Sequence, residues 1–141
     1  MKRLFSICML VAVIIGSSSF TTNSTKNPNE NTFKRFYVLL TGTQTLDNGC
    51  VVTMQVSVAF DWTPATGVTN VTWNAPTFTI SCGNYTRTGD ITTLNFDNQN
   101  AHATELVFTR TGDENVDAFT SNPHNITVLI ADMNSQIDGQ K

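Results

Sequence analysis

Residues 50–62 constrain the fold of this chain more than any other stretch. Apolar side chains occupy every second position, with mostly small or polar side chains between them, and the apolar positions are Cys50, Val52, Met54, Val56, Val58, Phe60 and Trp62. A strand repeats its side-chain direction every two residues, whereas a helix repeats it about every 3.6 residues. The alternation therefore predicts one long β-strand with one face packed and the other in water.

The composition favours strands and turns over helices. Thr and Asn are frequent, only 13% of the residues are charged, and no stretch after the N-terminal segment has the pattern of a strong helix former. With 141 residues, the chain is long enough for one hydrophobic core and too short for two. We therefore expect one all-β domain.

The first residues have the layout of a secretory signal peptide, which we place at residues 1–19. Lys2 and Arg3 precede an apolar run over residues 4–15, and small residues follow. A membrane anchor needs about twenty apolar residues, so we expect cleavage and no integral membrane segment in the mature protein. This predicts a secreted or periplasmic protein. Residues 20–32 are polar and are expected to form a flexible leader before the β-domain at residues 33–141.

A second extended segment, ending at Cys82, is expected to pair with the first in an antiparallel hairpin. Its apolar positions change from odd to even numbers along the segment, which indicates a β-bulge near Pro76. Matching the inward faces gives the register Cys50 opposite Cys82, Val52 opposite Ile80, Met54 opposite Phe78, Val58 opposite Trp73 and Phe60 opposite Val71. In an oxidising compartment, Cys50 and Cys82 are expected to form a structural disulfide.

Shorter apolar segments predict the remaining strands. They lie at residues 36–40, 91–96, 104–109 and 125–131, with a further short piece at Val116 and Phe119. In the last strand the alternating residues are Ile126, Val128 and Ile130. We expect about six to seven antiparallel strands arranged as a β-sandwich or a flattened barrel.

The charge balance argues against nucleic acid as a partner. Removing Lys2 and Arg3 with the signal peptide leaves six basic and eleven acidic side chains, a net charge of −5. His102 and His124 lie in polar segments without metal-site spacing, and the sequence holds no nucleophile motif. We therefore expect neither an enzyme nor a cofactor.

One acidic segment resembles part of a calcium loop. Asp113, Asn115 and Asp117 alternate oxygen-bearing side chains, but the segment lacks the glycine and the acidic twelfth ligand of a helix-loop-helix site. Only a weaker calcium site between β-loops remains a candidate there.

Aromatic side chains supply three weak candidates for ligand binding. Tyr37 and Tyr85 fall off the predicted apolar faces, where an exposed ring can stack on a sugar. Trp62 is expected in the core or at its edge, although its place at a strand end beside Asp61 also fits a rim.

Two repeated motifs add further candidates. Arg87 and Arg110 belong to the sequence Thr-Arg-Thr-Gly-Asp, which occurs at residues 86–90 and 109–113. It is either a duplicated binding loop or, as we favour, one turn used twice, with Gly at positive φ and Asp capping the turn. Thr-x-Thr pairs could form rows that bind an ordered surface such as ice or crystalline polysaccharide. Strand propensity on a solvent face is the simpler explanation.

These features favour an exported all-β binding module whose partner is a glycan, a peptide or another protein. The alternative is a structural or assembly subunit of a cell-surface layer or fibre, in which exposed strand edges and the leader join neighbouring copies.

Overall fold

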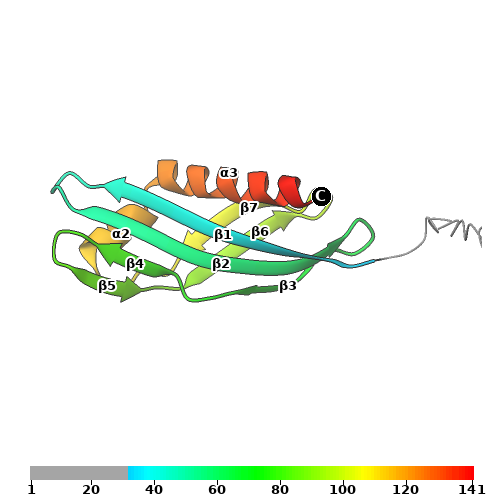
Figure 1. Cartoon of the computed structure of the whole chain (residues 1–141), viewed down its shortest axis with the longest axis horizontal. Coiled ribbons are helices and arrows are strands. Elements are labelled where there is room, and N and C mark those ends of the chain that lie inside the picture. Colours follow the sequence, from blue (N-terminus) through cyan, green and yellow to red (C-terminus); the bar gives the residue numbers. More distant parts are fainter. Residues whose placement is uncertain (1–31) are drawn as a thin grey trace, which may run out of the picture. The chain divides into compact units, whose positions relative to one another are not determined.

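Two long antiparallel strands, β1 (Lys34–Thr45) and β2 (Val51–Thr63), form the framework of the computed structural model (Figure 1). The structure describes residues 32–141. The predicted signal peptide, and the predicted leader apart from its last residue, lie outside the described residues. The alternation predicted for residues 50–62 is confirmed, because even-numbered side chains of β2 from 52 to 60 are buried and odd-numbered ones are not.

β1 and β2 belong to a five-stranded antiparallel sheet, which we call sheet A. β2 also pairs along one half with β3 (Gly67–Trp73) and along the other with β4 (Thr77–Ile80), and β4 pairs with β5 (Tyr85–Thr88). A hairpin of β6 (Ile91–Asp97) and β7 (His102–Phe108) forms sheet B. The predicted class is confirmed: the seven described strands are antiparallel and form a sandwich-like all-β fold, without a closed barrel.

The predicted register of the hairpin is confirmed over most of its length. The pairs found are Val52 with Ile80, Met54 with Phe78 and Val58 with Trp73. Cys50 and Cys82 form the expected disulfide at the end of this pairing. The alternation therefore specified which residues face one another as well as which face inward.

The predicted bulge near Pro76 is wrong, because residues 74–76 form a break between β3 and β4. The Pro76 carbonyl accepts a hydrogen bond from the Gly89 N–H at 2.9 Å. The irregularity in pairing lies earlier in the chain, within β3, where Asn70 has a φ of 51° and the register shifts between Ala59 and Asp61. Phe60 therefore lies opposite an extra residue of β3 instead of Val71 alone.

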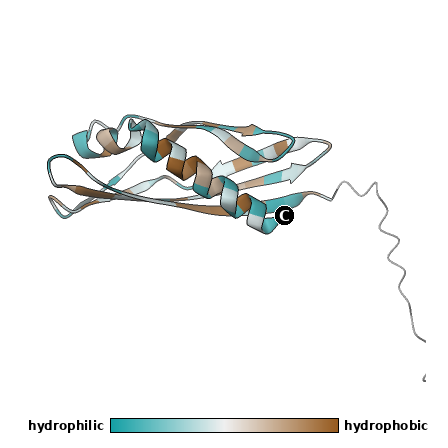
Figure 2. Ribbon diagram, turned by 90° about the horizontal axis from the view of Figure 1, so that it is seen from above, coloured by the Kyte–Doolittle hydropathy of each residue, from teal (hydrophilic) through white to brown (hydrophobic). Residues whose placement is uncertain are grey.

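The predicted last strand at residues 125–131 is also wrong, because these residues lie in helix α3 (Pro123–Gln140). The Asn122 side chain accepts from the His124 N–H, and Pro123 occupies the first turn, which together start the helix. The buried side chains recur every four residues, at Leu129, Met133 and Ile137. Figure 2 shows this recurrence of apolar residues along α3. No described helix is long and apolar enough to cross a membrane.

The short piece predicted around Val116 and Phe119 is helix α2 (Glu114–Thr120), and both side chains are buried on one of its faces. The sequence does not predict α3 because Ile126, Val128 and Ile130 alternate as in a strand, and at Val116 and Phe119 it predicts only a short apolar piece. A spacing of three residues fits a helix and not one face of a strand.

The core lies between sheet A and a second layer made of sheet B, α2 and α3. Aromatic contacts connect the layers: the Phe60 and Phe96 ring centroids lie 4.7 Å apart, and the Phe78 and Phe119 centroids 6.1 Å apart. Only one face of sheet A is used in this way. Its other face lies toward solvent.

Helix α3 lies between one edge of sheet A and one edge of sheet B. Gln136 accepts from the Leu39 N–H at 3.2 Å and donates to the Leu39 carbonyl at 2.9 Å. Gln140 makes the same pair of bonds with Tyr37, at 3.3 and 2.7 Å. On β7, Asn134 accepts from the Ala103 N–H at 2.6 Å and donates to its carbonyl at 3.1 Å. Each amide replaces the peptide group of a missing neighbouring strand.

Candidate functional site

The exposed face of sheet A carries almost no charge. One row across four paired strands consists of Thr43, Thr53, Thr79 and Thr86, and the next row of Thr41, Gln55, Thr77 and Thr88. Among the outward residues of the described strands of sheet A, only Arg35 and Asp61 are charged. They form an ion pair with a nitrogen–oxygen distance of 3.0 Å. This face therefore offers hydrogen-bonding groups with little net field.

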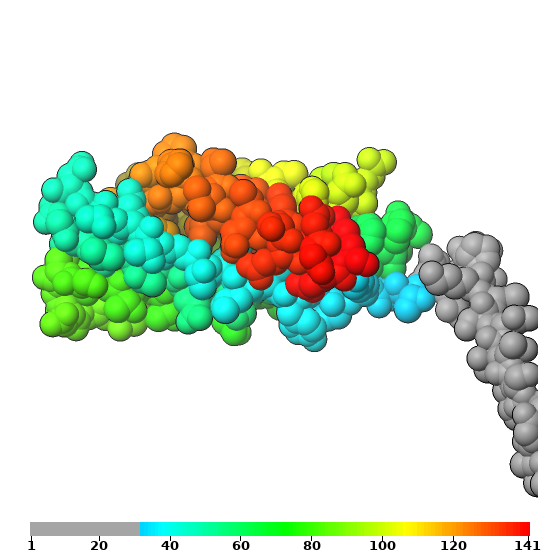
Figure 3. Space-filling view, turned by 45° about the horizontal axis from the view of Figure 1, so that its top comes forward, coloured from blue at the N-terminus to red at the C-terminus, as the bar shows by residue number. Residues whose placement is uncertain are grey.

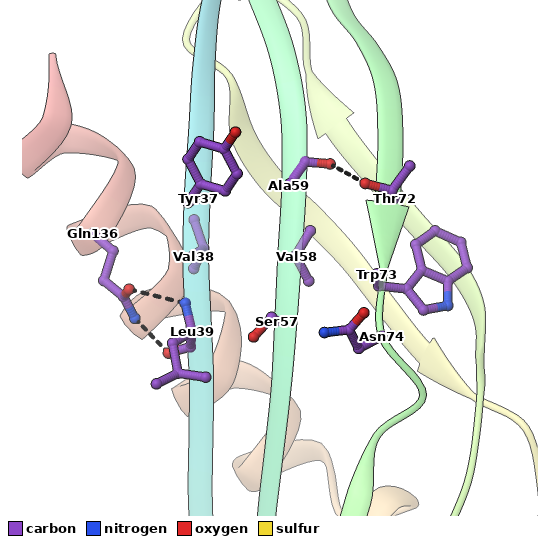
Figure 4. Close-up of a pocket in the computed structure, with 10 residues that line it drawn as sticks. All are labelled: Tyr37, Val38, Leu39, Ser57, Val58, Ala59, Thr72, Trp73, Asn74 and Gln136. Carbon is purple, nitrogen blue, oxygen red and sulfur yellow. Dashed lines mark hydrogen bonds between the residues drawn. The ribbon is translucent and has the colours of Figure 1, made fainter.

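A groove of about 410 Å³ lies on this face. Tyr37 and Leu39 of β1 form one side, Ser57 and Ala59 of β2 the floor, and Thr72 and Asn74 the other side (Figure 4). Tyr37 is 69% exposed and Leu39 is 44% exposed. Exposed apolar side chains beside a hollow are typical of ligand-binding surfaces.

The polar groups of the groove divide into occupied and available ones. Gln136 uses its amide on the Leu39 backbone, and Thr72 Oγ1 lies 3.4 Å from the Ala59 carbonyl that it donates to. No hydrogen bond within residues 32–141 engages the Ser57 hydroxyl or the Asn74 side-chain amide. The Asn74 N–H donates to the Ser57 carbonyl at 3.0 Å, which holds the two residues together. A ligand in the groove can use both side chains.

An ion pair fixes one end of the groove. The Arg35 guanidinium lies 5.9 Å from the centre of the Tyr37 ring and donates to Asp61. The side-chain amide of Asn70 also donates to Asp61 at 2.7 Å. The bonds from Asn70 and Arg35 lower the pKa of Asp61, so this carboxylate stays ionised and neutralises Arg35.

Trp73 departs from the sequence expectation. It pairs with Val58 as predicted, but it is 36% exposed, because β3 is an edge strand at this point. Figure 4 shows the indole pointing away from β2. Its N–H donates to Asp90 at 2.8 Å, and this bond, with one from the Ile91 N–H, lowers the pKa of Asp90.

The structure brings together two of the five predicted ligand candidates. Tyr85 and Arg87 both lie on β5, where the Arg87 guanidinium is 4.5 Å from the centre of the Tyr85 ring. Arg87 also forms an ion pair with Asp113 at 3.2 Å. These partners leave both side chains engaged within the fold. Tyr37 lies on the opposite face of sheet A from this cluster.

The other two predicted candidates lie elsewhere. Trp62 is half-buried, and its indole N–H donates to the Asn98 carbonyl at 2.8 Å. It therefore packs at the edge of the core, with Phe36 in edge contact. Arg110 is exposed and borders a separate hollow between β7, α2 and α3.

The calcium candidates serve the loop before α2. Asp113 caps α2 by accepting from the Asn115 and Val116 N–H groups at 3.0 and 3.2 Å. Partial burial opposes its ionisation, but hydrogen bonds, led by the one from Val116, prevail and lower its pKa. Asp117 accepts from the N–H and hydroxyl of Thr111 at 2.8 and 3.0 Å, and these bonds lower its pKa. Within the described residues, no group of three or more His, Cys, Asp or Glu is placed to hold a metal.

The two copies of the Thr-Arg-Thr-Gly-Asp motif contact each other through Arg87 and Asp113. Gly112 has the expected positive φ, at 80°, whereas Gly89 does not. At Gly89 an added Cβ would lie 3.1 Å from the Phe78 ring, a tight contact that favours glycine there by packing and not by backbone conformation. The acid of each copy accepts backbone N–H groups, as expected for turn caps.

The groove residues were partly visible in the sequence. Alternation along β1 placed Tyr37 off the apolar face. Ser57 and Asn74 were missed as a pair, because their proximity depends on how β3 returns along β2. Comparisons of the chain with protein-family models, with curated proteins and with solved structures found no match.

Proposed function

We propose that this protein is an exported binding module that takes a neutral glycan in the groove on the exposed face of sheet A. The observation that carries this proposal is the exposed Tyr37 ring at the wall of an uncharged groove. The peptide and protein partners also considered from the sequence fit this surface less well. The face is rich in the hydroxyl groups of small side chains, and a sugar matches these hydroxyls more directly than a peptide or protein does.

The groove offers the two kinds of contact that a sugar ring needs. The C–H face of a sugar packs on an aromatic ring, and Tyr37 with the adjacent Leu39 supplies that apolar surface. Sugar hydroxyls both donate and accept hydrogen bonds, as the Ser57 hydroxyl and the Asn74 amide do. Neither group has a protein partner to give up within the described residues.

Binding fits the groove better than catalysis. Tyr37 is the one titratable side chain among its lining residues. General acid–base catalysis needs an acid or base placed against the reacting group, with a pKa suited to proton transfer. The lining supplies hydrogen-bonding groups instead.

Two observations support export. The N-terminal residues have the layout of a signal peptide. The structure contains a Cys50–Cys82 disulfide. Disulfides persist in oxidising compartments and are rare in cytosolic proteins.

The test is a glycan array probed with the wild-type chain, Tyr37→Ala and the control Phe33→Ala. Phe33 is also an exposed aromatic residue, 57% exposed, and it lies outside the groove lining. We expect the wild type and Phe33→Ala to bind the same neutral glycans, and Tyr37→Ala to bind about tenfold more weakly or worse. Binding to no neutral glycan, or equal binding by Tyr37→Ala, would contradict the proposal.

A further inference from the structure

Helix α3 covers only part of the outer edge of β1. Gln140 pairs with Tyr37 and Gln136 with Leu39, so the helix runs antiparallel to the strand. Four helical residues rise about 6 Å and two strand residues about 6.8 Å. Every fourth residue of the helix can therefore lie beside every second residue of the strand, where the backbone groups point outward.

The residues four and eight positions before Gln136 are Asp132 and Val128, and neither can make the same pair of bonds with the strand backbone. Asp132 has no donor for a backbone carbonyl, and its carboxylate accepts from Gln136 Nε2 at 2.9 Å instead. Val128 has no polar group, and it is 51% exposed. The series would have placed these residues beside Thr41 and Thr43.

Among the described residues, the backbone of residues 41–45 therefore has no partner along its outer edge. The N–H and carbonyl of Tyr37 and Leu39 point away from β2, because they bond to α3. By the two-residue period of an antiparallel ladder, those of Thr41, Thr43 and Thr45 point the same way. No hydrogen bond within residues 32–141 engages these outward groups.

The surroundings of this edge leave room for another strand. A groove of about 360 Å³ lies between the end of β1 and the first turns of α3. Figure 3 shows the end of β1, in cyan, extending beyond the start of α3, in orange. Residues 41–45 contain no charge and no proline, and β1 pairs with β2 there without a bulge. Charged residues, prolines and bulges are the features by which proteins commonly protect a sheet edge, so this edge lacks such protection.

We propose that residues 41–45 of β1 pair antiparallel with the same residues of a second copy of this chain, about a two-fold axis at Thr43. Thr43 then faces its own counterpart, and Thr41 faces Thr45 of the other copy. In an antiparallel ladder these positions, two residues apart, all belong to the hydrogen-bonded set. Facing threonines are favourable cross-strand partners, so the edge is complementary to itself.

This contact is separate from the proposed glycan groove. Tyr37 and Leu39 keep their bonds to α3, and the exposed face of sheet A continues from one copy into the next. A two-fold contact closes at two copies and builds no fibre. With five residues from each copy the interface is smaller than that of a stable dimer, so association depends on protein concentration.

Disulfide trapping tests the register. In the full chain carrying Cys8→Ser, Thr43→Cys adds one thiol on the proposed axis. Hydrogen-bonded antiparallel partners have Cα atoms about 5.5 Å apart, a distance that a disulfide spans. The matched control is Thr41→Cys, whose counterpart would lie about 13 Å away along the strands.

We expect covalent dimers of Thr43→Cys under mild oxidation and none of Thr41→Cys. When the Thr41→Cys protein is mixed with the Thr45→Cys protein, we expect dimers that contain one chain of each. Equal cross-linking of Thr43→Cys and Thr41→Cys would indicate random collision and overturn the proposal. Absence of cross-linking in both would overturn it too.

Sedimentation of the uncrosslinked chain gives an independent readout. Thr43→Pro removes the outward N–H, which the fold does not use, whereas Thr43→Val keeps it. We expect the wild type and Thr43→Val to dimerise as concentration rises and Thr43→Pro to stay monomeric with a similar melting temperature. Monomers of the wild type at every concentration, or dimers of Thr43→Pro, would contradict the model.

Discussion

Single side chains secure the loop that leads into α2. Asp117 accepts hydrogen bonds from the Thr111 N–H and hydroxyl and from the Gly112 N–H, the last at 3.2 Å. These bonds favour the ionised form and lower the pKa of Asp117 in the folded protein. A carboxylate with a lowered folded-state pKa stabilises the fold above its unfolded pKa. That stabilisation is lost as pH falls through the folded-state value.

Asp117→Asn tests this role. We expect it to reduce the free energy of unfolding at pH 7 by about 1–3 kcal/mol, because the amide nitrogen cannot accept from Gly112. The difference from the wild type should shrink below about pH 4, where the wild-type carboxylate loses its advantage. Denaturant unfolding at several pH values measures both effects, with Asp47→Asn in an exposed turn as control. A difference that does not change with pH would refute the electrostatic account.

The disulfide acts at the same scale. Cys50 and Cys82 are separated by 32 positions, and closing such a loop stabilises a fold by about 3 to 4 kcal/mol on the chain-entropy model. We expect Cys50→Ala with Cys82→Ala to lose roughly that amount in denaturant unfolding. Reduction of the wild-type chain should give a similar loss, and a loss below about 1 kcal/mol in both would argue against a structural role.

At the scale of elements, the sequence predicted long patterns well and short ones poorly. The alternation of β2 is long enough to exclude a helix, and it specified the partners of Val52 and Met54. Ile126, Val128 and Ile130 alternate over only five positions, and the cap at Asn122 and the spacing of Leu129, Met133 and Ile137 predict a helix. The contacts of Gln136 and Gln140 could not be predicted, because they depend on where α3 packs.

The glutamine pairs of α3 protect the edge of β1. Gln136→Glu with Gln140→Glu keeps the shape but removes the donors to the Leu39 and Tyr37 carbonyls. We expect a loss of about 1–3 kcal/mol in unfolding free energy, because each carbonyl then faces a carboxylate. Light scattering should also show more aggregation. Gln55→Glu, on the exposed face, adds one such charge away from α3 and should change neither property, and the single variants Gln136→Glu and Gln140→Glu are its charge-matched counterparts.

The same geometry predicts a substitution that stabilises the fold. Asp132→Gln supplies the amide that the helix series lacks beside Thr41. We expect unfolding free energy to rise by about 0.5–1.5 kcal/mol. Cross-linking of Thr43→Cys should fall, because the edge is then partly covered. Unchanged stability and cross-linking together would show that the series ends at Gln136 for another reason.

At the scale of the whole molecule, the two faces of sheet A lie in different environments. One face packs against sheet B and the helices, and the other carries the neutral threonine rows and the Tyr37 groove. Pairing at residues 41–45 would place two grooves on one continuous surface. A glycan long enough to reach both would be held more tightly than by one copy alone.

The measurement that tests the central claim most directly is a titration of the isotope-labelled protein with neutral oligosaccharides, followed by amide chemical shifts. The account predicts that shift changes cluster on the groove, at Tyr37, Leu39, Ser57, Thr72 and Asn74. The absence of any change across a broad panel of neutral oligosaccharides, or a cluster at α2 and β7 instead, would contradict it.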